Sequence, residues 1–183
     1  TVEHGAKQRK VSGAPAPEPA DAPARDLAFV AHDDDHSKRY VPRLLELGYR
    51  VVDKSSTYRA DPAVPLVAAG VNHTQIRENT RLVANPNCTT MPLVLVLSRL
   101  LARFGLESVT VSTYQAVSGA GQSTLDDFLE RNAAGYMVSD RLGLGFDPGG
   151  YAGNTVPHNG KTDESGFSAE ERKLMFESRR ILG

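Results

Sequence analysis

The sequence contains a single cysteine, Cys88, so it can form neither an internal disulfide nor a zinc site built on several thiolates. Its 21 Lys and Arg residues nearly balance 22 Asp and Glu residues, which gives no basis for binding nucleic acid or an anionic membrane surface. No apolar run approaches the roughly 20 residues of a membrane-spanning helix, and the first residues show no signal-peptide core. We therefore expect no membrane, no nucleic-acid partner and a reducing compartment: the cytoplasm, or a plastid in a plant-like source. The start at Thr1, without a methionine, indicates part of a longer chain.

The composition changes sharply near residue 26. Residues 13–25 are mostly Ala and Pro with scattered acidic residues, a composition that cannot bury a core, so we expect residues 1–25 to be loosely packed. From residue 26 onward the pattern predicts strands at 27–31, 49–53, 81–84 and 108–114, and helices at 37–47, 92–104 and from about 123. Short strands that alternate with helices are typical of parallel βαβ units, so the predicted fold is an open α/β sheet.

Three polar loops directly follow predicted strands, at residues 53–56, 85–88 and 115–121. In open α/β sheets the ligand crevice lies beyond the carboxyl ends of the strands, so we expect these loops to converge on one rim. Cys88 lies where the strand at 81–84 turns into a helix. In the first turn of that helix, unpaired backbone N–H groups would stabilise a thiolate nucleophile. The alternative is a small buried side chain, which is the usual place of a free cysteine.

The motifs in these loops resemble those of aspartate-semialdehyde dehydrogenase. The matching segments are VVDKSSTYR (51–59), DPAVPLV (61–67), NPNCTT (85–90), VSTYQAVSGAG (111–121), NTVPH (154–158) and the helix that begins near Glu170. The likeness runs from about residue 26 to 183, with a weaker hint at 7–11. It implies an incomplete Rossmann-like NADP-binding domain over 26–84 and part of an α/β catalytic and dimerisation domain over 85–183.

The resemblance also implies an activity, which is reversible NADP-dependent reductive dephosphorylation of aspartyl 4-phosphate to aspartate semialdehyde. This reaction belongs to the biosynthesis of lysine, threonine, methionine and diaminopimelate. Cys88 matches the family's nucleophile, and a thioester on its sulfur divides one difficult hydride transfer into two easier steps. The implied ligands are the substrate, phosphate and NADP, no metal is implied, and a homodimer is the implied assembly.

Ten further residues take roles from the same resemblance. Asn87 and Gln115 act with Cys88 in catalysis and substrate orientation. Arg59, Glu170 and Lys173 bind the substrate and its phosphate. The cofactor contacts are Ser118 and Gly119, with Ser55, Ser56 and Asn85 as further contributors.

Local interpretations of the same residues stay open. Asn87 also suits a helix cap, and Gln115 an ordinary surface position. Arg59 could pair with Asp61 on the surface, and Glu170 with Lys173 in a solvated ion pair of small energy. The run 118–121 could simply form a tight turn.

Several family features are missing from the sequence. No Gly-rich phosphate loop follows a strand in the first 50 residues. Where the family has small residues after the strand at 27–31, this chain has His32 and three aspartates, Asp33 to Asp35, which would repel a pyrophosphate. None of the histidines, at positions 4, 32, 36, 73 and 158, matches the family's acid–base residue.

The alternative hypothesis is therefore a truncated, inactive relative that binds a ligand or pairs with an intact subunit. An unrelated cysteine hydrolase is a weaker alternative, because no histidine is a convincing partner for Cys88. We also expect exposed sheet edges and apolar helix faces, and hence marginal stability or aggregation of the isolated chain.

Overall fold

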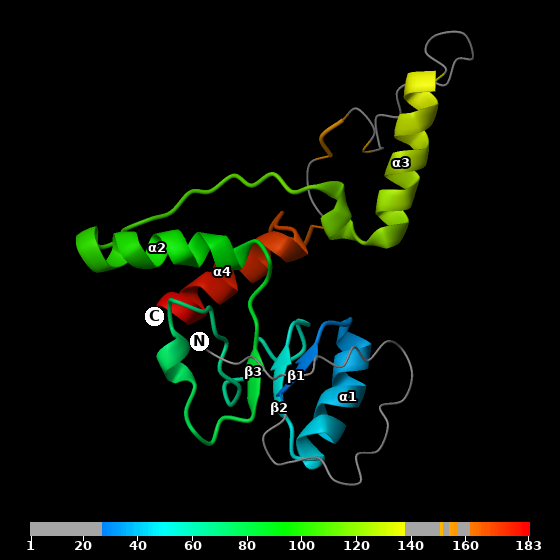
Figure 1. Ribbon diagram of the computed structural model, residues 1–183. Helices are drawn as coiled ribbons and strands as arrows, with labels where there is room; N and C mark the ends of the chain where they lie inside the picture. Colours follow the sequence, from blue (N-terminus) through cyan, green and yellow to red (C-terminus); the bar gives the residue numbers. More distant parts are fainter. Residues whose placement is uncertain (1–26, 138–150, 152–153, 157–161) are drawn as a thin grey trace, which may run out of the picture.

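The computed structural model describes residues 27–137, 151, 154–156 and 162–183 (Figure 1). The expectation of a loosely packed segment at 1–25, the weak likeness at 7–11, and the positions of His4 and His158 lie outside these residues. Within them, three parallel strands form one sheet in the order β1 (Leu27–Val30), β2 (Arg50–Asp53) and β3 (Leu82–Ala84). The predicted α/β fold with a parallel sheet is confirmed.

The helix α1 (Asp34–Glu46) connects β1 to β2 and packs on the sheet. Its inward side chain Val41 is buried against Val30 and Val51, which form a small core with it. The helix begins three residues before the predicted start, because Asp33 caps it by accepting a hydrogen bond of 2.9 Å from the His36 main-chain N–H. Acidic residues in the first turn also stabilise the helix, because their negative charge lies at the positive end of its dipole.

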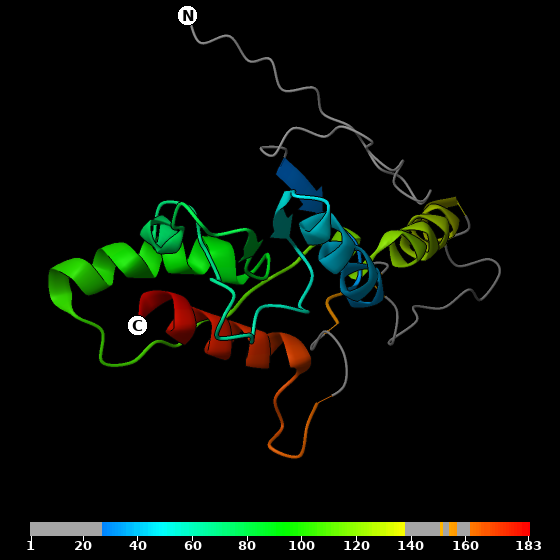
Figure 2. The same ribbon diagram turned by 90° about the horizontal axis from the view of Figure 1, so that it is seen from below.

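A second core joins distant segments of the chain. The helices α2 (Thr90–Phe104) and α4 (Ala169–Leu182) lie side by side in both views (Figures 1 and 2). Val94 of α2 and Ile181 of α4 pack with Leu66 and Ala84, so the end of the chain is fixed against β3. A short 3-10 helix, η1 (His73–Gln75), lies between the loop at 61–72 and β3. None of the helices in the described ranges is long and apolar enough to span a membrane.

The predicted strand at 108–114 is wrong. These residues form no strand, and no other strand of the described part pairs with them. They run as an extended connection to η2 (Val117–Ala120) and α3 (Gln122–Met137), which stand apart from the sheet (Figure 1). Val109, Val111 and Tyr114 are exposed, the last to 89%. Alternating apolar residues form a strand only where a neighbour supplies backbone hydrogen bonds and burial.

Candidate active site

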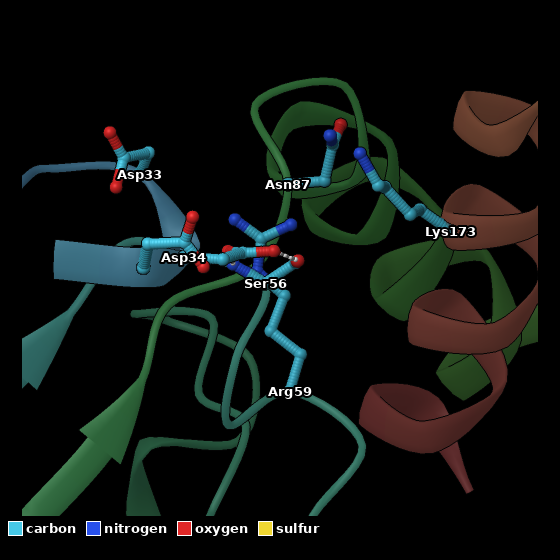
Figure 3. Close-up of a pocket in the computed structure, with 7 residues that line it drawn as sticks. Asp33, Asp34, Ser56, Arg59, Asn87 and Lys173 are labelled. Carbon is cyan, nitrogen blue, oxygen red and sulfur yellow. Dashed lines mark hydrogen bonds between the residues drawn. The ribbon is translucent and has the colours of Figure 1, made fainter. Parts of the chain in front are cut away.

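The loops after β2 and β3 meet at the carboxyl edge of the sheet. Because Asp53 and Ala84 are paired in register, Lys54 and Asn85 leave the sheet beside each other, and the Asn85 N–H donates to the Asp53 carbonyl over 2.8 Å. A cavity of about 410 Å³ opens at this edge. It is lined by Asp33, Asp34, Asp35, Ser56, Arg59, Asn87 and Lys173. Figure 3 shows Asn87 and Lys173 on one side of it and Asp33 and Asp34 on the other, with Arg59 between them.

Cys88 is exposed at this edge, so the alternative of a buried side chain is wrong. The thiol lies just before α2, because Thr89 is the N-cap residue and Thr90 begins the helix. Its expected place in the first helical turn is therefore wrong by two residues. The sulfur lies 3.7 Å from Gln115 Nε2 and 3.9 Å from Asn87 Oδ1. The third predicted loop thus reaches the same rim, although the strand expected before it is absent.

Asn87 connects the cysteine loop (residues 85–88) to the rest of the site through three atoms. Its Oδ1 accepts a hydrogen bond of 2.8 Å from the Thr89 N–H, just before the start of α2. Its Nδ2 donates to Glu170 Oε2 over 2.7 Å, and its main-chain N–H donates to Glu177 Oε2 over 2.6 Å. The side chain therefore closes a local turn just before α2 without capping the helix, and it also contacts the face of α4.

Glu170 and Lys173 form an ion pair of 2.7 Å on α4, and Glu170 also holds Asn87. Lys173 lines the cavity. Since both side chains are partly buried and one of them contacts the cysteine loop, the pair is more than a solvated surface contact. A cation of the cavity wall, together with its partner carboxylate, thus lies beside the loop that carries the nucleophile candidate.

Arg59 is buried and pairs with Glu177, so the alternative of a surface pairing with Asp61 is wrong. Its Nη1 forms an ion pair of 3.0 Å with Glu177 Oε1, and its Nη2 donates to the Lys54 carbonyl over 2.7 Å. The remaining donor, Nε, is buried with no partner in the described part of the chain. Because Arg59 also lines the cavity, the charge of its guanidinium group lies at the wall of the site.

Glu177 is the functional candidate that the sequence reasoning missed. It lies seven residues after Glu170 on α4, so Glu170, Lys173 and Glu177 follow the helical spacing of one face. The sequence offered one indication of this role, which is an acidic residue at a position where an amphipathic helix faces the core. Its partner Arg59 is 118 residues away, which no local pattern reveals.

Asp34 occupies the donors of Ser56. Its carboxylate accepts hydrogen bonds from the Ser56 hydroxyl at 2.5 Å and from the Ser56 main-chain N–H at 2.8 Å (Figure 3). The hydroxyl bond is the main reason why the pKa of Asp34 is lowered, with smaller contributions from the N–H bond and from Lys38 and Lys173. An ionised carboxylate of the chain therefore sits where an anionic ligand of Ser56 would bind.

The other residues predicted to contact the cofactor lie in two places. Ser55 is buried and donates to Asp53 over 2.6 Å, so its hydroxyl points into the fold. Asn85 donates to the Pro86 carbonyl over 2.9 Å. Ser118 and Gly119 lie in the exposed turn η2, beside Gln115. A Cβ on Gly119 would collide with the Gln115 amide, so this glycine makes room for the side chain that reaches Cys88.

Two family models match the chain. Residues 2–79 match the semialdehyde dehydrogenase NAD binding domain, and residues 97–183 match the semialdehyde dehydrogenase dimerisation domain. The aspartate-semialdehyde dehydrogenase of Mycolicibacterium smegmatis is 38% identical over 182 residues, which cover 91% of this chain and 53% of that protein. The enzyme of Rickettsia conorii is 35% identical over 160 residues, which cover 86% of this chain and 47% of that protein.

Solved structures give the same result for the fold. Aspartate semialdehyde dehydrogenase II from Vibrio cholerae, complexed with ASA, matches with a TM-score of 0.76 and 29% identity, over 86% of this chain and 47% of that one. The enzyme from Francisella tularensis matches with a TM-score of 0.72 and 26% identity, over 86% and 50% of the two chains. The chain spans about half the length of the curated relatives it matches.

Proposed function

Because this chain belongs to the aspartate-semialdehyde dehydrogenase family, we propose that it serves the reversible NADP-dependent conversion of aspartyl 4-phosphate to aspartate semialdehyde and phosphate. The observation that carries the proposal is the meeting of Cys88 with Gln115 at a cavity edge formed by Asn87, Arg59 and Lys173. These side chains come from three separate loops and one helix. Their convergence supports a common task in acyl transfer.

In this proposal the ionised Cys88 sulfur attacks the acyl carbon of aspartyl phosphate. The C–S bond forms, the bond from the acyl carbon to the phosphate oxygen breaks, and phosphate leaves with that electron pair. The amide of Gln115, 3.7 Å from the sulfur, donates to the carbonyl oxygen as negative charge develops on it. The thioester that results holds the aspartyl group at the rim of the cavity.

Fixed cations beside the cysteine loop suit the anionic phosphate. Arg59 places a guanidinium charge at the cavity wall, and Lys173 lines the same cavity with its ammonium group. Glu170 contacts two residues of the cavity wall, Asn87 and Lys173, and in this proposal its carboxylate accepts from the substrate's ammonium group. Both cations already contact a carboxylate, which holds them in place and also lowers the net positive charge of the site.

The cofactor fits these residues poorly. A semialdehyde dehydrogenase NAD binding domain is the matching family model, and NADP is the cofactor that we propose. Asp34, however, occupies both donors of Ser56, and three aspartates line the cavity. A dinucleotide phosphate would meet carboxylates there rather than free donors. The chemistry that the described residues support is therefore the acyl-transfer half of the reaction.

Phosphate release tests this proposal directly. The purified chain, incubated with freshly prepared aspartyl 4-phosphate, should release phosphate faster than the uncatalysed rate and carry an aspartyl adduct on Cys88, seen by intact-protein mass spectrometry. The Cys88→Ser variant is the matched control and should form no thioester. Equal phosphate release from both proteins would remove Cys88 from the mechanism.

A second candidate function is a relative that pairs with a subunit without turning over substrate. The occupied Ser56 donors favour it, as do the exposed apolar side chains Leu100, Leu101 and Phe104 of α2, which lie in the part that matches the dimerisation domain. It predicts a stable dimer with no thioester, whereas the first proposal requires the thioester. In both functions we propose that the chain forms a homodimer.

A further inference from the structure

We propose that Glu177 is a positioning residue that fixes the Cys88 loop and Arg59 in one geometry. This inference rests on the proposed function in one respect, which is that the fixed geometry holds Cys88 ready for acyl transfer. The contacts themselves can be tested without substrate. No other carboxylate in the described part of the chain binds a main-chain N–H of the cysteine loop.

Glu177 uses both carboxylate oxygens on separate segments. One oxygen, Oε1, lies 3.0 Å from Arg59 Nη1 in the loop after β2. The other, Oε2, accepts from the Asn87 N–H at 2.6 Å in the loop after β3. The residue is 1% exposed, so its carboxylate forms these contacts away from water. One residue of α4 thus connects the two loops that form the cavity.

A buried carboxylate of this kind is costly unless its charge is paired. Arg59 supplies the charge, and the Asn87 N–H supplies a further hydrogen bond to the charged group. A buried ion pair adds little net stability compared with apolar residues of similar size. Its contribution here is geometry, because a well-packed apolar side chain at position 177 would leave the Asn87 N–H and the Arg59 guanidinium without their acceptor.

The hydrogen bond from the Asn87 N–H to Glu177 affects Cys88 because Asn87 is the neighbouring residue. Asn87 directly precedes the cysteine, and its N–H belongs to the peptide unit between Pro86 and Asn87, one unit before the one that leads into Cys88. If that peptide unit rotates, the sulfur moves relative to Gln115 Nε2, which is now 3.7 Å away. Glu177 therefore acts on the thiol through the backbone and not by touching the substrate.

The test compares Glu177→Asp with wild type. The shorter carboxylate keeps the charge and its attraction to Arg59, but it cannot also reach the Asn87 N–H. Amide hydrogen exchange of Asn87, followed by NMR, should become about tenfold faster, the factor expected for losing one hydrogen bond to a charged group. The rate of Cys88 alkylation by iodoacetamide should change in the same variant. Cys88 is the only cysteine, so this signal has a single source.

Two further variants separate positioning from general stability. Glu177→Gln keeps the length and one acceptor oxygen, so it should restore Asn87 protection to within about threefold of wild type. Asp163→Asn removes an ion pair of 2.6 Å with Arg172 on the exposed side of α4 and should leave Asn87 exchange and Cys88 alkylation unchanged. If Glu177→Gln fails to fold, the comparison of Glu177→Asp with Asp163→Asn still decides.

Unchanged Asn87 exchange in Glu177→Asp would overturn the proposal. So would equal changes in Glu177→Asp and Asp163→Asn, because the effect would then be a general loosening of α4. Neither measurement needs substrate or cofactor. Absence of phosphate release would therefore count against the proposed function and leave this result intact.

Discussion

At the scale of single residues, carboxylates decide what the cavity can bind. Arg59 and Lys173 are the cations at its wall, and each already contacts a glutamate of α4. Asp34 fills the donors of Ser56 on the opposite side. The cavity can therefore attract a phosphate near Cys88 but opposes one near Ser56.

Replacing Asp34 should change that balance. In Asp34→Asn the Ser56 N–H and hydroxyl lose their charged acceptor, and the cavity loses one negative charge. We expect inorganic pyrophosphate to bind about tenfold more tightly than to wild type, the effect typical of one or two charge-assisted contacts. Titration followed by the NMR shift of the Ser56 amide measures it. Asp35→Asn removes a charge without freeing Ser56, and an equal gain in that control would contradict the role of the Ser56 donors.

The same carboxylate should make stability depend on pH. The pKa of Asp34 is lowered in the folded chain, mainly by the Ser56 hydroxyl. The resulting stabilisation is fully present above the ordinary pKa of aspartate and is lost as the pH falls through the lower folded value. We expect Asp34→Asn to be less stable than wild type at neutral pH and the difference to shrink in acid. Denaturant unfolding across that range checks it, and a difference that stays constant with pH would contradict it.

At the scale of elements, α4 is the part that assembles the site. Its face carries Glu170, Lys173 and Glu177, and Arg180 donates to the carbonyls of Arg59, Asp61 and Val64. The helix starts at a capping box in which Ser168 accepts from the Glu171 N–H and Glu171 accepts from the Ser168 N–H. The start of this helix therefore controls the position of several site residues.

Removing that cap should lower stability by a predictable amount. Ser168→Ala deletes the hydroxyl acceptor and should cost about 1 kcal/mol of unfolding free energy. Chemical denaturation monitored by circular dichroism measures the loss. Ser165→Ala, in the exposed turn before the helix, offers a nearby hydroxyl that does not cap it. A loss of equal size in both variants would show that the cap is not the source.

The turn η2 gives a second test at this scale. Gly119→Ala adds a Cβ that would collide with the Gln115 side chain, so the amide should move away from Cys88. If Gln115 stabilises the developing oxyanion, phosphate release should fall about 100-fold, the order of magnitude for one such donor. Ala120→Ser enlarges the neighbouring position of the same turn and should leave the rate near wild type. A wild-type rate of phosphate release in Gly119→Ala would show that Gln115 does not stabilise the oxyanion.

At the scale of the whole molecule, local patterns predicted the elements and missed the long-range pairs. The three strands of the sheet and the helices α1 and α2 follow from short β-rich runs and from Gly48 and Gly105, which end their helices in left-handed backbone. The run at 108–114 has the same local pattern but no neighbouring strand in the described part of the chain. The pair of Arg59 with Glu177 depends on the packing of α4, which no short window of sequence contains.

The exposed face of α2 leads to the last prediction. Leu100 and Phe104 lie one helical turn apart and are exposed, Phe104 to 73%, within the part that matches the dimerisation domain. Apolar area of this kind favours association, so we expect the purified chain to self-associate. A carboxylate buried in the contact is unfavourable, so Phe104→Glu should shift the chain toward monomer in light scattering after size exclusion. Gln75→Glu adds the same charge at an exposed position away from α2 and should not shift it. Equal association of wild type and Phe104→Glu would place the contact between subunits on another surface.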